Sequence, residues 1–143
     1  MRYTSVNEIS GLLNNLGLKK NDNLIVHSSL FSLGKIQDGT RGFYKSIRNI
    51  IGENATLVVP AFTYSFRRNE TFDINNTPVA KEIGSFSEYI RKHNDSVRSL
   101  NPLFSFAGIG PEAKDILQLE TKYCFGMKSI FKCFENKNFK VLA

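Results

Sequence analysis

A histidine and two serines directly follow a short apolar stretch near the N-terminus. Residues 24–26 read Leu-Ile-Val without polar alternation, which is typical of a strand buried on both faces. His27, Ser28 and Ser29 come next. In open α/β sheets, ligands bind beyond the carboxyl ends of the strands, so these three side chains are candidates for ligand binding. The alternative is a capping turn, in which the serines bond to nearby backbone groups.

The same pattern occurs again further along the chain. Residues 56–62 form a second apolar run, followed by Thr63 and Tyr64. The connection between the two runs is long enough for a right-handed crossover, so we expect parallel strands. Residues 103–109 read as a third buried strand. We expect Arg98, Ser99 and Ser105, which lie in and just before this run, to line the same crevice as His27.

Helical patterns alternate with these strands. Ser5 and Glu8 have capping-box spacing ahead of an apolar stripe that Gly17 ends. Further helices are predicted from Thr40 to residue 51, over 84–93, over 111–119, and as a short turn at 130–134. The alternation predicts an α/β fold, a three-layer α/β/α arrangement with a largely parallel central sheet, and one domain over residues 1–143.

The C-terminal residues are informative about the sheet. Residues 139–143 read as the first part of another buried strand, so we expect the sheet to be incomplete within these 143 residues. An edge strand that closes the sheet is the alternative.

The composition is that of a globular protein. Hydrophobic residues make up 41% of the chain, and no apolar run approaches the ~20 residues that a membrane span needs. The N-terminus lacks the apolar core of a signal peptide, so a cytoplasmic location without a membrane partner is expected. Cys124 and Cys133 are then expected to be thiols, and they have no neighbours at metal-ligand spacing, so no metal is expected.

The net charge of +6 favours an anionic partner. Nucleic acid is one such partner, but the basic residues are scattered. Only Lys19-Lys20 and Arg67-Arg68 are adjacent pairs, and no nucleic-acid-binding motif accompanies them. We therefore expect no nucleic-acid partner, and a phosphorylated cofactor fits the charge better. The sequence leaves the oligomeric state open, and a homo-oligomer is compatible with it.

Taken together, these segments resemble the aminoglycoside 3-N-acetyltransferases, which are distinct from the GNAT acetyltransferases. Each segment is short, but all of them stand in the family's order. The matching segments are residues 26–30, 56–65, 72–73, 77–78, 84, 97–99, 102, 105–110, 125–126, 129 and 140–142.

The resemblance implies transfer of an acetyl group from acetyl-CoA, the cosubstrate, to an amine of an aminoglycoside or related amino sugar. It implies a cofactor side formed by His27, Ser28, Ser29, Thr63, Tyr64, Arg98, Ser99 and Ser105. Arg98 would bind a phosphate, or alternatively pair with Asp95 or Asp73. Asp73 and Glu70 are the nearest carboxylates for a cationic acceptor, in a loop over residues 66–82 that we expect to be mobile and to border the acceptor. A solvated loop face is the alternative for Glu70.

The chain departs from the family pattern at two positions. Asn101 stands where the family usually has a histidine before Pro102, and Ile130 stands where a proline is common. The resemblance also implies that this chain corresponds to the N-terminal half of family members, whose general base lies later. No catalytic residue is therefore assigned, and we expect the 143-residue chain to turn over poorly. The alternative hypothesis is a non-catalytic CoA-binding remnant.

Overall fold

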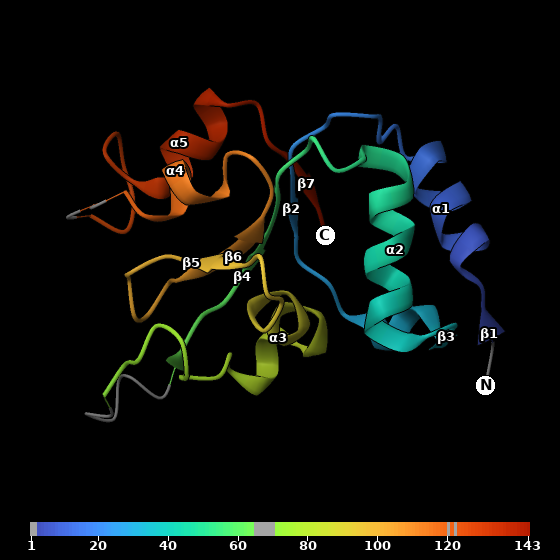
Figure 1. Ribbon diagram of the computed structural model, residues 1–143, viewed down its shortest axis with the longest axis horizontal. Coiled ribbons are helices and arrows are strands. Elements are labelled where there is room, and N and C mark those ends of the chain that lie inside the picture. The colour runs from blue at the N-terminus through green and yellow to red at the C-terminus, as the bar shows by residue number, and fades with distance from the viewer. Residues whose placement is uncertain (1–2, 65–70, 120, 122) are drawn as a thin grey trace.

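The computed structural model describes residues 3–64, 71–119, 121 and 123–143 and shows a mixed α/β fold (Figure 1). The helices are α1 (Val6–Asn15), α2 (Gly39–Ile51), α3 (Ser85–Arg91), α4 (Ala113–Leu117) and α5 (Ile130–Asn136), with 3₁₀ turns η1 (Leu30–Leu33) and η3 (Lys81–Ile83). The strands are β1 (Tyr3–Thr4), β2 (Leu24–Val26), β3 (Lys35–Ile36), β4 (Leu57–Pro60), β5 (Val97–Arg98), β6 (Phe106–Ile109) and β7 (Lys140–Leu142).

The main sheet has the strand order β5-β6-β4-β2-β7. Strand β2 pairs in parallel with both β4 and β7, which confirms the predicted parallel pairing of the first two buried strands. Strand β6, however, runs antiparallel to β4 and to β5. The sheet is therefore mixed, and the prediction of a largely parallel sheet was wrong.

The physical reason lies in how β5 and β6 are connected. Helix α3 carries the chain from β4 back across the sheet, so β5 runs in the same direction as β4. A connection of only a few residues, 99–105, then joins β5 to β6. A short connection can form a hairpin but cannot contain the crossover that parallel strands require. Strand β6 therefore returns antiparallel and fills the position between β5 and β4.

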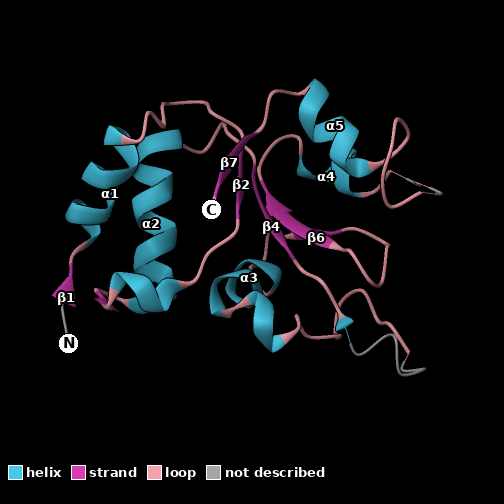
Figure 2. Ribbon diagram, turned by 180° about the vertical axis from the view of Figure 1, so that it is seen from behind, coloured by secondary structure: helices cyan, strands magenta, loops and turns pink. Residues whose placement is uncertain are grey.

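Helices cover both faces of the sheet (Figure 2). On one face, Val26 of β2 and Val59 of β4 pack with apolar residues of α1, α2 and α3. On the other face, Ile25 and Val58 pack with α4 and α5. Because neighbouring residues of a strand point to opposite faces, each continuous apolar strand contributes to both cores.

Local signals predicted most helix ends correctly. The Ser5 hydroxyl accepts a hydrogen bond from the backbone N–H of Glu8, and the Glu8 carboxylate accepts one from the Ser5 backbone, which completes the predicted capping box. Helix α2 begins at Gly39, one residue before the predicted cap Thr40, because Asp38 takes a left-handed conformation with φ of 57°. Helix α4 begins two residues after the predicted start at Pro111.

Strand β7 lies at the edge of the sheet. Its partner β2 has hydrogen-bonded neighbours on both sides, whereas β7 pairs with β2 alone among the described strands. Val141 is 65% exposed. The predicted strand at residues 139–143 is confirmed, but its predicted burial was wrong, because no described element covers its outer side.

A buried arginine ties the end of α2 to the sheet. The Arg48 guanidinium donates to the backbone carbonyl oxygens of Gly52 (3.0 Å), Ala55 (2.8 Å) and Ile109 (3.1 Å). Its Nε also donates to the Tyr44 hydroxyl at 3.1 Å. These carbonyls lie in the turn before β4 and at the end of β6, so one side chain holds both segments against α2.

Replacing Arg48 with methionine is expected to destabilise the fold. The apolar chain has a similar length but leaves buried carbonyls without donors, at a cost of about 2–4 kcal/mol. Urea unfolding followed by circular dichroism measures this loss. Arg41→Met, at an exposed position of the same helix, is the matched control and should change stability little. Equal losses in both variants would contradict the assignment.

Candidate functional site

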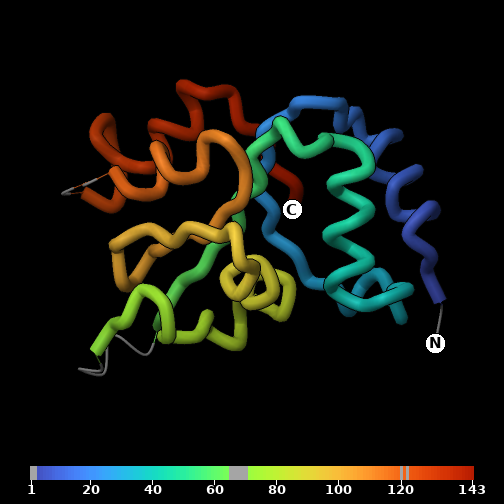
Figure 3. The backbone as a smooth tube through the Cα atoms, in the orientation of Figure 1, coloured from blue at the N-terminus to red at the C-terminus, as the bar shows by residue number. Residues whose placement is uncertain are grey.

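The carboxyl ends of β2, β4 and β5 and the amino end of β6 meet at one edge of the sheet, called here the strand-end edge. The register places Pro60 of β4 opposite Phe106, the first residue of β6, and Arg98 of β5 opposite Ala107. In Figure 3 the chain leaves β2 toward the start of α2 and leaves β4 toward the loop before α3. Nearly all the residues predicted to bind cofactor follow or precede strands at this edge.

The turn after β2 exposes two hydroxyl groups. Within the described part of the chain, neither the Ser28 nor the Ser29 hydroxyl takes part in a hydrogen bond. Ser29 precedes η1 but makes no side-chain cap, whereas its carbonyl accepts from the Ser32 hydroxyl at 2.8 Å. The capping alternative is thus not what the structure shows, and both hydroxyls remain available to a ligand.

Two hollows lie on either side of this turn and share Ser28 and Ser29. One, of about 370 Å³, includes His27 and is lined mostly by apolar residues of α1, α2 and the chain end. The other, of about 350 Å³, is bordered by Lys81 and Gly84. Gly84 has φ of +101°, and a Cβ there would lie 3.3 Å from the Ser28 carbonyl oxygen, so glycine lets the two loops approach closely.

Arg98 connects three parts of the strand-end edge. Its Nη2 donates to the Ala61 carbonyl (2.7 Å) and to the Thr63 hydroxyl (2.8 Å), and its Nε donates to the Ser105 hydroxyl at 3.1 Å. Its Nη1 donates to the Thr77 carbonyl. The structure therefore brings Arg98, Thr63 and Ser105 together as one buried hydrogen-bonded cluster, the Arg98 cluster.

Burial, together with the nearby positive charge of Arg91, lowers the pKa of Arg98 to about 10, while the Glu88 carboxylate opposes this shift. Arg98 still carries its charge near pH 7. Neither Asp73 nor Asp95 is among its described partners. The Phe72 ring lies over the guanidinium, with 4.8 Å between the guanidinium carbon and the ring centroid. The alternative of an ion pair with either aspartate is not observed, and phosphate binding stays a prediction.

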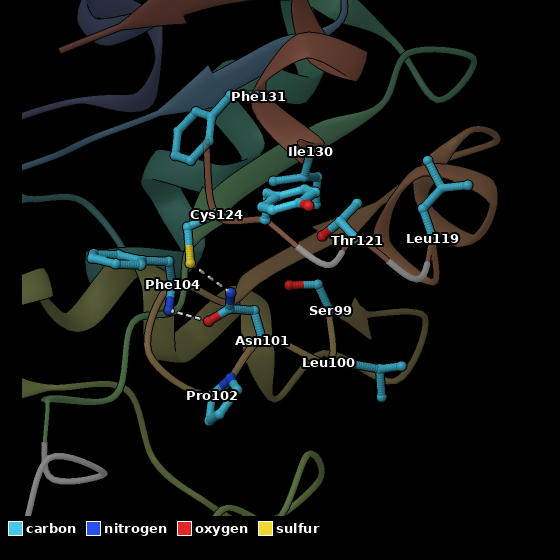
Figure 4. A pocket seen from close by; sticks show the side chains of 11 residues that line it. Ser99, Leu100, Asn101, Pro102, Phe104, Leu119, Thr121, Cys124, Ile130 and Phe131 are labelled. Carbon is cyan, nitrogen blue, oxygen red and sulfur yellow. Dashed lines mark hydrogen bonds between the residues drawn. The ribbon is translucent and has the colours of Figure 1, made fainter. Parts of the chain in front are cut away.

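Ser99 lies apart from this cluster. Its hydroxyl accepts from the Phe106 backbone N–H at 2.9 Å, on the face of the sheet covered by α4 and α5. There it lines a separate hollow of about 450 Å³ together with Asn101 and Cys124 (Figure 4). Ser99 therefore lies across the sheet from Ser28, and a cofactor contact by Ser99 or Arg98 stays a prediction.

The Asn101 side chain forms hydrogen bonds within the turn between β5 and β6. Its carbonyl oxygen accepts from the backbone N–H groups of Leu103 (3.0 Å) and Phe104 (2.9 Å). Its amide nitrogen donates to the Cys124 sulfur at 3.2 Å. An amide held in this way shapes the turn and has no proton-accepting role near neutral pH.

The two histidines occupy different ends of the sheet. At the strand-end edge, partial burial lowers the pKa of His27 below its usual value, so its imidazole is mainly neutral at pH 7. His93 lies after the last turn of α3, toward the opposite edge. Its Nδ1 accepts from the Asp95 backbone N–H at 3.3 Å, and its ring packs against Tyr44. His93 therefore lies away from the predicted site, and its described contacts are structural.

The predicted acceptor residues are only partly described. Glu70 lies outside the described residues, as does the loop from Phe66 up to it. Asp73 is exposed and accepts hydrogen bonds from the Asn75 and Asn76 backbones and the Asn76 amide, which lower its pKa. Tyr64 is 36% exposed, beside Phe62. Substrate contact by these residues stays a prediction.

The described residues contain neither a metal-ligand cluster nor a membrane-spanning helix. Across residues 3–64, 71–119, 121 and 123–143, no group of three or more histidine, cysteine, aspartate or glutamate side chains could hold a metal ion. No helix in the described segments combines the length and apolar character of a membrane span.

Comparison with known proteins identifies the family. The family model described as aminoglycoside 3-N-acetyltransferase matches residues 25–143. The chain belongs to this family. It is 36% identical over 110 residues to aminoglycoside N(3)-acetyltransferase IV from Salmonella sp.. The matched region covers 77% of this chain and 41% of that protein. The chain thus spans about two fifths of the length of this relative.

Solved structures agree with this assignment. A mutant of the aminoglycoside acetyltransferase AAC(3)-IVa in complex with apramycin is 28% identical, with a TM-score of 0.85, over 99% of this chain and 56% of that chain. AAC-IIIb in a binary complex with CoASH is 20% identical, with a TM-score of 0.86, over 98% of this chain and 59% of that chain. The second likeness shows the fold alone.

Sequence reasoning missed several groups at the strand-end edge. The carbonyls of Ala61 and Thr77, which hold Arg98, carry no sequence signal, because every residue has a carbonyl. Glu88 was also missed. Its carboxylate accepts from the Val79 backbone (3.0 Å) and from Arg91 Nη2 (2.7 Å), and so anchors the loop that contacts Arg98.

Hydrogen bonding, first from Arg91 and then from the Val79 backbone, lowers the pKa of Glu88 to about 2, against the opposing effect of burial. A lowered carboxyl pKa stabilises the fold above the ordinary value of 4.5, and this contribution is lost as pH falls toward 2. Glu88→Gln should therefore destabilise the protein by about 1–2 kcal/mol at pH 7, allowing for screening of a partly exposed carboxylate, and by less at pH 3.

Urea unfolding at pH 7 and pH 3 measures both values. Glu53→Gln, at an exposed carboxylate before β4, is the control and should have little effect at either pH. A Glu88→Gln defect that is as large at pH 3 as at pH 7 would show that the carboxylate charge is not what stabilises the loop.

Proposed function

We propose that this chain forms the cofactor side of an acetyltransferase that moves the acetyl group of acetyl-CoA to an amine of an aminoglycoside or related amino sugar. The observation that carries the proposal is the family match over residues 25–143, together with the free hydroxyls of Ser28 and Ser29 at the strand-end edge. A relative at 28% identity holds apramycin, and a structurally similar protein holds CoASH.

The reaction sets two chemical requirements. When the acceptor amine attacks the thioester, the carbonyl oxygen gains negative charge and needs preorganised hydrogen-bond donors. The acceptor must also lose a proton to a base. Acetyl-CoA, when bound, supplies the thioester, and the overall positive charge of the chain suits its phosphates.

The described residues meet the first requirement better than the second. Ser28 and Ser29 provide hydroxyl donors in a fixed turn, and the neutral His27 imidazole has one N–H donor and one acceptor beside them. The Arg98 cluster holds the neighbouring strand ends in place and contributes a positive charge. We propose that these residues bind and orient acetyl-CoA, and we assign none of them as the base.

A second candidate function is CoA binding without turnover. The position of Asn101 favours it, because this amide is held by Leu103, Phe104 and Cys124 and provides no imidazole at the turn. Turnover separates the two candidates, whereas both require CoA binding.

The combined substitution of Ser28 and Ser29 by alanine is expected to weaken CoA binding about tenfold. Each lost hydrogen bond to a ligand typically changes binding by about 0.5–1.5 kcal/mol. Isothermal titration calorimetry with CoA measures the change. Asn54→Ala removes an exposed polar group from the turn before β4, at the opposite edge, and serves as the control. Unchanged affinity in the double variant would exclude this turn from the cofactor site.

Turnover is tested with acetyl-CoA and apramycin, by following release of the CoA thiol. Because Asn101 replaces the usual histidine and His93 lies away from the site, we expect CoA to bind but acetylation to be slower by about 10²–10⁴-fold than in a full-length relative. Rates comparable to that relative would show that the base function is present in this chain and would exclude the candidate without turnover.

A further inference from the structure

The outer side of β7 is an open strand edge. In Figure 2, β7 lies on the side of β2 that is nearer to α1 and α2. The Lys140 N–H donates to the Asn23 carbonyl at 2.9 Å. The Leu142 carbonyl accepts from the His27 N–H at 2.8 Å. In a parallel pair every second residue directs both backbone groups to its partner strand, so Lys140 and Leu142 face β2 and Val141 faces outward.

Lys140 does not protect this edge. Natural edge strands are commonly kept from pairing with other chains by a charged side chain, most often lysine. The Lys140 ammonium group instead turns back to its own chain, where it donates to the Asp22 carboxylate at 2.6 Å and to the Gly17 carbonyl at 3.2 Å. Its charge is therefore neutralised, and the backbone of Val141 stays accessible to another strand.

Apolar side chains of α1 and β7 surround the open edge. Leu12 is 49% exposed, Leu16 is 74% exposed and Val141 is 65% exposed. Two hollows, of about 370 and 360 Å³, lie between the helix and the strand and share Leu13, Leu16, Leu142 and Ala143. An exposed apolar surface of this kind, continuous with an open strand edge, is typical of a protein interaction site.

The helix beside this edge carries little charge. Glu8 is the only charged residue within residues 6–18, although the chain as a whole has a net charge of +6. That net charge makes two copies of the chain repel each other, so their association is favoured through a surface low in positive charge. The surface of α1 and β7 meets this condition, and depletion of charged residues is typical of the centre of protein interfaces.

We propose that a second copy of this chain pairs with β7 in antiparallel orientation, so that the two main sheets join into one continuous sheet. In an antiparallel ladder, two opposite residues whose backbone groups face each other exchange both hydrogen bonds. Val141 has this orientation, so it pairs with Val141 of the second copy and the two-fold axis passes between them. A strand of an unrelated protein is the alternative occupant, but the low charge and the self-complementary register favour a second copy.

The same symmetry places the two α1 helices on one face of the joined sheet. Leu142 is in register with Val26 and packs against the core beneath α1. Opposite residues of an antiparallel pair point to the same face, so this core lies on the same face in both copies. Leu12 and Leu16 of each copy then flank the seam between the two β7 strands. This arrangement closes after two copies, because each copy uses its open β7 edge once.

Val141→Pro tests the strand pairing. Proline lacks the N–H that the second copy needs, but this N–H does not take part in the pairing with β2, so the fold is expected to persist. The dissociation constant of the dimer should rise about tenfold or more. Val141→Thr is the matched control, because it keeps both the N–H and the β-branched shape, and it should dimerise like the wild type. Sedimentation velocity measures the mass, and circular dichroism checks the fold.

Leu16→Asn tests the apolar part of the interface without touching the sheet. It should weaken dimerisation about tenfold. Leu100→Asn is the matched control, because Leu100 is 55% exposed and follows β5 at the other end of the sheet. Added salt should strengthen the dimer, because it screens the repulsion between two positively charged copies.

A disulfide tests the register directly. Opposite residues of a hydrogen-bonded antiparallel pair have Cα atoms about 5.5 Å apart, which suits a disulfide. Oxidised Val141→Cys should therefore form a covalent dimer linked through position 141. Leu142→Cys should not, because position 142 lies opposite position 140 of the second copy. The wild type, which has Cys124 and Cys133, is the control for other cross-links.

A wild type that dimerises, with the losses described for Val141→Pro and Leu16→Asn, would support the inference. A wild type that remains monomeric up to millimolar concentration would overturn it, and would leave the edge to a different partner. A dimer that persists in both variants, or that cross-links more readily through position 142 than through position 141, would also overturn it. If Val141→Pro does not fold, Leu16→Asn and the disulfide decide the outcome.

Discussion

The guanidinium of Arg98 is the group on which the strand-end edge depends. It is almost fully buried and still charged, which is unfavourable unless its donors are paired. Its partners are the Ala61 and Thr77 carbonyls and the Thr63 and Ser105 hydroxyls. One side chain thereby joins the end of β4, the start of β6 and the loop that leads to α3. Glu88 supports the same loop from α3 through the Val79 backbone.

The return of β6 between β4 and β5 determines what the site can contain. Because β6 runs antiparallel, its amino end meets the carboxyl ends of its neighbours, and Ser105 lies next to Arg98. The same hairpin sends Ser99 to the opposite face of the sheet. The adjacent residues Arg98 and Ser99 therefore point to opposite faces of the sheet, as the alternation of side chains along a strand requires. Arg98 belongs to the buried Arg98 cluster, whereas Ser99 lines the hollow beside α5.

The chemistry at this edge favours binding over proton transfer. The serine turn has free hydroxyls, and the neighbouring hollow adds a cation and an exposed aromatic ring. Asn101 stabilises a turn through two backbone N–H groups, which is a structural role. The family membership and the free hydroxyl donors are consistent with the proposed role of this edge in binding acetyl-CoA.

The sequence alone determined the helices, the strands β2, β4, β6 and β7, and the edge of the sheet where the candidate site lies. The apolar runs of β2, β4 and β6 have no polar alternation, and the Ser5–Glu8 capping box is a local pattern. Both can therefore be predicted from the sequence without knowledge of the tertiary structure. The polar residues after each run marked the strand-end edge. Tertiary structure alone decided the direction of β6 and the separation of Ser99 from Arg98.

The tertiary structure also decided the partners of Arg98, the closeness of Gly84 to Ser28 and the exposure of β7. The physical reason is that strand pairing and burial depend on contacts between residues far apart in the chain. Backbone carbonyls such as those of Ala61 and Thr77 carry no residue-specific signal. Which of them meets a buried guanidinium is settled only when the sheet, the hairpin and the loop before α3 pack together.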